Sequence, residues 1–128
     1  MAMRREAVHT DRAPAPVGPY SQAVRAGGFV FTSGQIPLDP ATGQMVAGDV
    51  QAEAEMVFGN LAAVLEAAGT SLDRAVKVLV FLTDMADFGA VNEVYARWFS
   101  EPFPARSCVA VAGLPKGARV EIELVALA

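Results

Sequence analysis

Apolar residues follow two different periods along this chain. A period close to 3.6 residues runs through residues 49–68 and again through residues 87–100, and both stretches are predicted to be helices. Asp49 is a suitable N-cap for the first helix, and Gly69 stands where a helix commonly ends. Two amphipathic helices of this length are enough to cover one face of a sheet.

The remaining apolar stretches have the lengths and turn boundaries of strands. They lie at residues 5–9, 23–26, 29–33, 75–83, 103–112 and 120–124. Gly27 and Gly28 separate the second and third stretches and indicate a hairpin, while the short first stretch suits a sheet edge. The element order β-β-β-α-β-α-β-β therefore predicts an α+β fold.

The run from Val78 to Leu82 is apolar at every position and should lie inside the sheet with both faces covered. Two helices cover only one face, so the other must meet a second copy of the chain or remain an exposed apolar patch, which soluble monomers rarely tolerate. The run is ended by Lys77 and Asp84 and is too short to span a bilayer. We therefore expect an oligomer of unspecified order and no membrane partner.

Composition narrows the function further. The 128 residues suit a single domain spanning residues 1–128, with 53% hydrophobic and 19% charged residues. A net charge of −4 without a basic cluster makes nucleic acid a poor partner. Residues 1–6 lack an apolar core, so we expect no signal peptide and a cytoplasmic location. The chain has a single cysteine, which excludes an internal disulfide. With only one histidine in addition, the chain has too few cysteine and histidine ligands for a zinc site.

No serine, cysteine or histidine arrangement forms a credible nucleophile–base pair, so any chemistry must use other groups. Arg106 and Cys108 share one face of a predicted strand, and Glu121 and Glu123 share the polar face of the last strand. A guanidinium suits a planar carboxylate, and a glutamate can accept a proton. From these residues alone, a structural ion pair is the preferred interpretation of Arg106 and a late-strand glutamate.

The sequence also suggests roles for Gly34, Asn92 and Cys108. Asn92 is either a polar residue at a helix boundary or an amide that orients a ligand in a cleft. Gly34 lets the backbone approach another group closely after the third strand. Cys108 is better interpreted as a small buried thiol than as a nucleophile.

Short motifs in a fixed order make the chain resemble the RidA family (reactive intermediate deaminase A, also called YjgF). The resemblance covers nearly the whole chain and leaves out the residues before Ala7. The motifs are residues 18–23 (GPYSQA), 32–37 (TSGQIP), 60–61 (NL), 66–69 (EAAG), 91–95 (VNEVY), 104–108 (PARSC), 114–116 (LPK) and 120–123 (VEIE).

The resemblance implies a fold of the chorismate mutase type, with a mixed sheet, two helices on one face and a barrel-centred homotrimer. The family's sites lie in clefts between subunits. By match of motif, Arg106 would bind the substrate carboxylate and Glu121 would handle the water. The cleft would be lined by Tyr20, Ser33, Gly34, Asn92 and Cys108. Since the implied fold does not make the last two strands neighbours, Arg106 and Glu121 should meet across a subunit boundary, with Ser33 on the chain that supplies Glu121.

The implied activity is hydrolysis of reactive 2-imino acids, such as 2-iminobutanoate and 2-iminopropanoate, to 2-keto acids and ammonia, without metal or cofactor. A binding or regulatory module is the alternative, because the same Arg106 cleft could hold a keto acid without turnover. Family members have also been described as ribonucleases, translation inhibitors or chaperones, and the acidic balance of this chain argues against the nucleic-acid versions.

Overall fold

Six strands form one mixed sheet in the computed structural model, which describes residues 4–128. Residues 1–3, part of the segment in which no export signal is expected, lie outside the described residues. The sheet order is β1-β2-β3-β6-β4-β5, and among the strands of residues 4–128 only β4 and β5 pair in parallel. The strands are β1 (Glu6–Val8), β2 (Ala23–Ala26), β3 (Phe29–Thr32), β4 (Ala75–Leu82), β5 (Ala105–Ala110) and β6 (Val120–Leu127).

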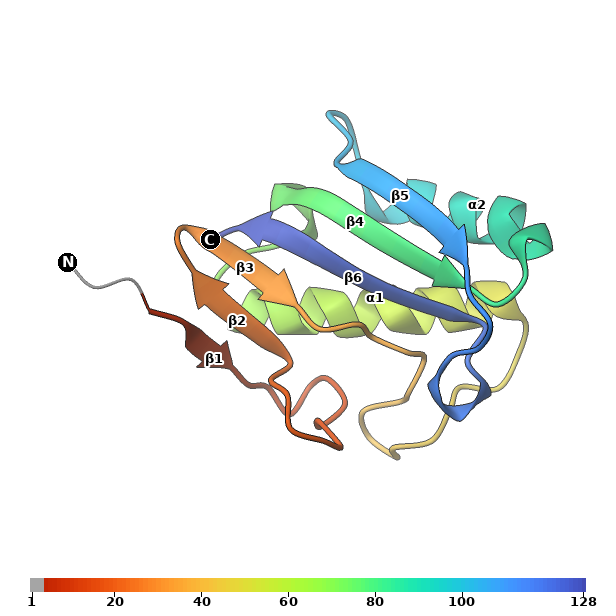
Figure 1. The fold of residues 1–128 in the computed structure, drawn as a ribbon, viewed down its shortest axis with the longest axis horizontal. Helices are drawn as coiled ribbons and strands as arrows, with labels where there is room; N and C mark the ends of the chain where they lie inside the picture. Colours follow the sequence, from red (N-terminus) through yellow and green to blue (C-terminus); the bar gives the residue numbers. More distant parts are fainter. Residues whose placement is uncertain (1–3) are drawn as a thin grey trace.

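Both helices, α1 (Val50–Ala67) and α2 (Phe88–Trp98), lie behind the same face of the sheet (Figure 1). Asp49 caps α1 as predicted, because its carboxylate accepts a hydrogen bond from the Ala52 backbone N–H at 2.9 Å. Gly69 follows the helix at φ 84°, a left-handed conformation that favours glycine. α2 is shorter than the sequence predicted, because Phe99 already has extended backbone angles.

The core lies between the helices and the sheet. α1 contributes fully buried side chains such as Phe58, Leu61 and Leu65. The alternation predicted for the last strand is confirmed, and its core residues pair with the core residues of β4. The buried strand residues are Val78, Val80 and Leu82 of β4 and Val120, Ile122 and Leu124 of β6. At about 1.5–3 kcal/mol for each buried aliphatic side chain, this layer supplies most of the hydrophobic stabilisation that the chain has on its own.

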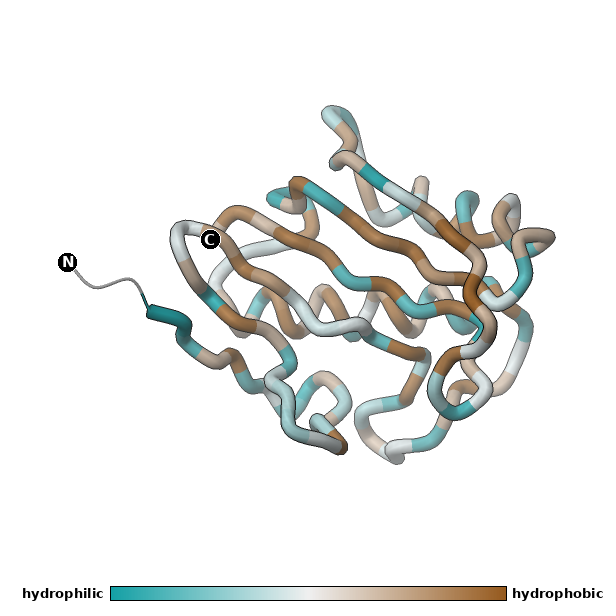
Figure 2. The backbone as a smooth tube through the Cα atoms, in the orientation of Figure 1, coloured by the Kyte–Doolittle hydropathy of each residue, from teal (hydrophilic) through white to brown (hydrophobic). Residues whose placement is uncertain are grey.

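The opposite face of the sheet carries no layer built from residues 4–128, and apolar side chains remain accessible there. Phe29 and Phe31 of β3, Val109 of β5 and Leu127 of β6 are all more than one third exposed. Figure 2 shows that β3, β4 and β6 are largely hydrophobic along their length. β4 is an interior strand between β6 and β5, as predicted. We call this uncovered surface the open face.

Two strand predictions differ from the structure by two or more residues at an end, whereas the other strands agree to within one residue. The stretch 103–112 forms a strand only over Ala105–Ala110, because two prolines precede it and the chain turns away after Ala110. The last strand extends three residues further than predicted, because Val125, Ala126 and Leu127 pair with β3. Over residues 4–128, no helix has both the length and the apolar character needed to cross a membrane.

Candidate active site

Arg106 lies on β5, an edge strand, and faces the helices. It pairs with Val78 and Cys108 pairs with Val80, both of which are buried beneath the helices. One guanidinium nitrogen (Nη1) of Arg106 donates a hydrogen bond to the Asn92 side-chain oxygen at 2.7 Å. The guanidinium carbon stands 4.6 Å from the ring centre of Tyr95 and 5.4 Å from that of Phe88. α2 therefore surrounds the Arg106 charge with an amide and two aromatic rings.

An open cavity of about 410 Å³ adjoins this group. Its lining residues are Asn92, Tyr95, Ala96, Phe103, Pro104 and Arg106. Cys108 lies in a smaller neighbouring hollow with the same arginine, and burial raises the pKa of its thiol although Arg106 partly offsets this effect. The thiol is therefore protonated at neutral pH, which supports a lining role over a nucleophilic one.

Glu121 lies on β6 and points to the open face. Its neighbours along the strand, Val120 and Ile122, are buried in the core, and it pairs with Phe81. Burial raises the pKa of Glu121, and the negative charge of Glu123 raises it further. A raised pKa makes a glutamate a better proton acceptor near neutral pH than an exposed glutamate would be.

Gly34 lies directly beneath the Glu121 side chain. A Cβ atom at this position would stand 2.2 Å from one carboxylate oxygen of Glu121 and 2.8 Å from its carboxyl carbon. Backbone hydrogen bonds between Gln35 and Ile122, at 2.9 and 3.2 Å, hold the two segments together at this point. The close approach predicted at Gly34 is therefore present, and the group that lies against Gly34 is the carboxylate of Glu121, the candidate base.

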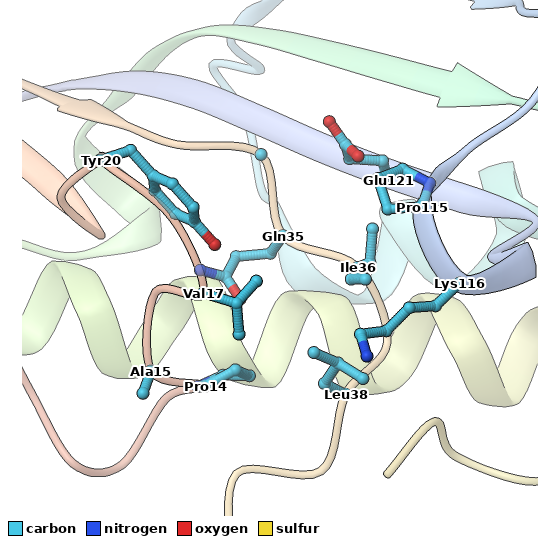
Figure 3. A pocket seen from close by; sticks show the side chains of 11 residues that line it. Pro14, Ala15, Val17, Tyr20, Gln35, Ile36, Leu38, Pro115, Lys116 and Glu121 are labelled. Atoms are coloured by element: carbon cyan, nitrogen blue, oxygen red, sulfur yellow. The ribbon is translucent and has the colours of Figure 1, made fainter. Parts of the chain in front are cut away.

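A cavity of about 190 Å³ opens beside Glu121 (Figure 3). Tyr20 and Glu121 stand on opposite sides of it, and the Lys116 side chain extends toward Leu38 rather than toward Glu121. The wall is mostly apolar and is completed by Pro14, Ala15, Val17, Gly34, Gln35, Ile36 and Pro115. Water held here would lie between a phenol and a carboxylate in a largely apolar setting.

The segment that carries Tyr20 is fixed by hydrogen bonds from the buried Gln22 side chain and the half-buried Ser33 side chain. The Gln22 amide donates to the carbonyls of Thr10 and Pro14 at 3.0 Å and accepts from the Thr10 N–H at 2.7 Å. Ser33 donates its hydroxyl to the Ser21 carbonyl at 2.5 Å. The Ser33 hydroxyl thus positions the Tyr20 segment, and Ser33 is not among the residues that line the cavity.

A second support holds the loop of Pro115 and Lys116. Glu53, buried on α1, accepts from the Arg119 side chain at 2.5 Å and from its backbone N–H at 2.9 Å. Arg119 also donates to the Gly48 carbonyl at 2.6 Å. This ion pair fixes the start of β6 one residue before Val120, and so it fixes the place where Glu121 emerges.

Within one chain, Arg106 does not form the structural ion pair with a late-strand glutamate that its residue type suggested. β4 lies between the strands of Arg106 and Glu121, and the two side chains point to opposite faces of the sheet. Within residues 4–128, neither side chain takes part in an ion pair. One chain therefore carries two separate clusters of candidate residues, which we call half-sites: Arg106 with Asn92 and Cys108, and Glu121 with Gly34 and Tyr20.

From the sequence, Phe88 and Tyr95 are predicted only to belong to the amphipathic helix at residues 87–100. A signal was present, because residues 88, 92 and 95 recur at spacings of four and three and so share one helix face with Asn92. Lys116 was also missed as a lining residue, and its positive φ of 57° is a feature of a short turn that sequence patterns do not reveal. In the part of the chain that the structure describes, no cluster of three His, Cys, Asp or Glu residues could hold a metal ion.

Solved structures share this fold over nearly the full chain. RidA from an Antarctic Psychrobacter has a TM-score of 0.92 at 50% identity, covering 96% of this chain and 99% of that one. Escherichia coli TdcF with bound serine has a TM-score of 0.90 at 44% identity, covering 96% and 98%. The fold is thus that of the small YjgF-like proteins.

Sequence comparison gives the same grouping. A family model described as Endoribonuclease L-PSP matches residues 10–128. The mouse (Mus musculus) 2-iminobutanoate/2-iminopropanoate deaminase is 48% identical over 123 residues, which cover 96% of this chain and 91% of the mouse protein. The chain belongs to the RidA (YjgF) family.

Proposed function

We propose that this protein is a cofactor-independent hydrolase that converts 2-imino acids, including 2-iminobutanoate and 2-iminopropanoate, to 2-keto acids and ammonia. The observation that carries the proposal is the pair of half-sites, one built around an arginine without an ion-pair partner within residues 4–128 and one around a glutamate with a raised pKa. The similarity to a mammalian deaminase of this name supports the same reaction.

In this proposal the Arg106 half binds the substrate carboxylate. A guanidinium offers two parallel N–H donors to a carboxylate, which a lysine ammonium cannot reproduce. Asn92 occupies one Nη1 donor and so limits how the guanidinium plane can turn. The TdcF structure with bound serine supports an amino-acid-like carboxylate as the ligand class.

Glu121 acts on the water. The water oxygen bonds to the imine carbon while one of its protons passes to Glu121, giving a tetrahedral carbinolamine. Glu121 then returns that proton to the nitrogen, which becomes an ammonium leaving group. The C–N bond breaks with its electron pair going to nitrogen, and Glu121 takes the hydroxyl proton as the carbonyl forms, so that ammonia leaves and this proton passes to it or to solvent. The carbon of a protonated imine is already electrophilic, so one positioned base is enough to catalyse the attack of water.

The two half-sites require a second copy of the chain, because in a single chain they lie on opposite faces of the sheet. The open face, with Phe29, Phe31 and Leu127, supplies the apolar surface for such contacts. We propose a homotrimer of single-domain chains in which the open faces meet, with Arg106 of one chain completing the Glu121 cavity of the next. Light scattering should then give three times the chain mass of 13.4 kDa.

The test is release of keto acid from imines generated in situ by an amino-acid oxidase, compared with the uncatalysed rate. Wild-type protein should accelerate the release, and Arg106→Ala should abolish it while leaving the assembly intact. Arg106→Lys should restore little, since the bidentate geometry is lost. Acceleration by Arg106→Ala equal to that of wild type would contradict the assigned role. Binding of 2-ketobutyrate without any acceleration by wild type would establish the non-catalytic module instead.

A further inference from the structure

Two aromatic rings and one amide surround the guanidinium of Arg106. Phe88, Asn92 and Tyr95 share one face of α2, and all three contact or closely approach this group. We propose that Phe88 and Tyr95 are positioning residues that hold the Arg106 guanidinium plane, so that its free N–H groups point to an incoming carboxylate. The identity of that carboxylate rests on the proposed function, whereas the positioning itself can be tested without turnover.

The charged neighbours of three arginines support a positioning role for the aromatic rings. Arg119 is fixed by the Glu53 carboxylate at 2.5 Å and Arg97 by Glu55 at 3.1 Å. Arg106, by contrast, has no carboxylate within 4.0 Å among the described residues. A carboxylate neighbour would fix the arginine but would also compete with a ligand carboxylate. Ring faces attract a guanidinium without neutralising its charge, so they fix the group and leave it available for an anion.

Tyr95 provides the rigid part of this support. Its side chain is only 6% exposed, and its ring packs against Phe99 at 4.5 Å and against Phe58 at 5.9 Å between ring centres. Within residues 4–128 the Tyr95 hydroxyl is buried and has no hydrogen-bond partner. An unpaired buried hydroxyl does not stabilise the fold. The ring, rather than the hydroxyl, is therefore the part of Tyr95 that acts on Arg106.

Phe88 provides the outer part. It is the first residue of α2 and is 37% exposed, so its ring contributes little to the core. Because it is partly exposed, its substitution should leave the fold intact. The attraction between an arginine and an exposed ring corresponds to roughly a two- to fivefold change in an equilibrium constant.

The experiment uses the full chain in its native assembly and compares Phe88→Leu, Phe88→Tyr, Phe88→Trp and Tyr95→Phe. The first readout is the order of the Arg106 side chain from ¹⁵N relaxation of its Nε–H group in the ligand-free protein. The second is the Kd of 2-ketobutyrate from calorimetry. We expect Phe88→Leu to lower the order and to weaken binding about two- to fivefold. Phe88→Tyr, Phe88→Trp and Tyr95→Phe should retain both, because each keeps a ring face.

Phe103→Leu is the matched control for the first readout. Phe103 is also an exposed phenylalanine, and it lines the open cavity beside Arg106. The close ring contacts of the Arg106 guanidinium are to Phe88 and Tyr95, so the loss of the Phe103 ring should not change Arg106 order.

Equal Arg106 order in wild type and Phe88→Leu would overturn the proposal, as would a Tyr95→Phe protein that binds 2-ketobutyrate as weakly as Phe88→Leu. Failure of the proposed function gives a different result. In that case wild type would release no keto acid from imines, while Phe88→Leu would still lower Arg106 order.

Discussion

Replacing Gly34 by alanine should disable the candidate base while leaving the fold nearly unchanged. The new Cβ atom would lie 2.2 Å from a carboxylate oxygen of Glu121, 2.8 Å from its Cδ and 3.1 Å from its Cγ. Nonbonded atoms do not approach this closely, so one group must move. All three atoms belong to one flexible side chain, which can rotate away at a cost of about 0.5–1.5 kcal/mol. Gly34→Ala should therefore fold and assemble.

Catalysis should suffer much more than stability. General base catalysis typically contributes about 10²–10⁴-fold, and misplacement of a reacting group by ~1 Å can cost ~10²-fold. We expect kcat/KM of Gly34→Ala to fall at least about 100-fold in the oxidase-coupled imine assay. The affinity for 2-ketobutyrate should change much less, because Arg106 belongs to the other half-site.

Two further variants isolate the cause. Gly113→Ala is the matched control, because a Cβ atom there would meet nothing within 4 Å, and it should retain wild-type activity. The double variant Gly34→Ala/Glu121→Gln should be no less active than Glu121→Gln alone, since both changes remove the same group. A Gly34→Ala enzyme within a few-fold of wild type would refute the reasoning. An unfolded variant would also refute it, because the Glu121 side chain would then be unable to move aside.

Two other predictions test the electrostatics and the scaffold. Glu121 must be ionised to accept a proton, so activity is lost as pH falls through its raised pKa. Glu123→Gln removes a negative charge that raises this pKa, and the variant should therefore move the acid limb of the kcat/KM profile to lower pH. An acid limb that does not move would contradict the coupling between the two carboxylates. Gly59 lies in the interior of α1, and a Cβ atom there would meet nothing within 4 Å. Gly59→Ala should therefore raise the free energy of unfolding by about 1 kcal/mol, measured by denaturant titration. A destabilised variant would instead reveal a contact at this position in the assembly.

Much of this fold follows from local patterns in the sequence. Asp49, Gly69 and the period of 3.6 residues place α1 to within one residue at each end. Strict alternation in the last strand places Val120 and Ile122 in the core and thereby turns Glu121 to the other face. These features depend on residues near one another in the chain, which is why they can be predicted.

The site depends on long-range register, which local patterns do not contain. Gly34 was expected to admit a close approach, but its partner Glu121 becomes known only from the pairing of Gln35 with Ile122. The interpretation of Arg106 as part of an ion pair failed for the same reason, because residue types alone do not reveal that β4 lies between the two late strands. The contacts of Phe88 and Tyr95 with Arg106 depend on how α2 lies against β5, which the helical period alone does not specify.

The central claim is that Arg106 of one chain and Glu121 of another form one hydrolytic site. Mixing inactive Arg106→Ala chains with inactive Glu121→Gln chains tests it most directly, with subunit exchange verified by mass spectrometry of differently tagged chains. A shared site predicts that mixed assemblies recover part of the wild-type imine hydrolysis, because some clefts regain both residues. If exchange is complete and no activity returns, the two residues do not act in a site shared between chains.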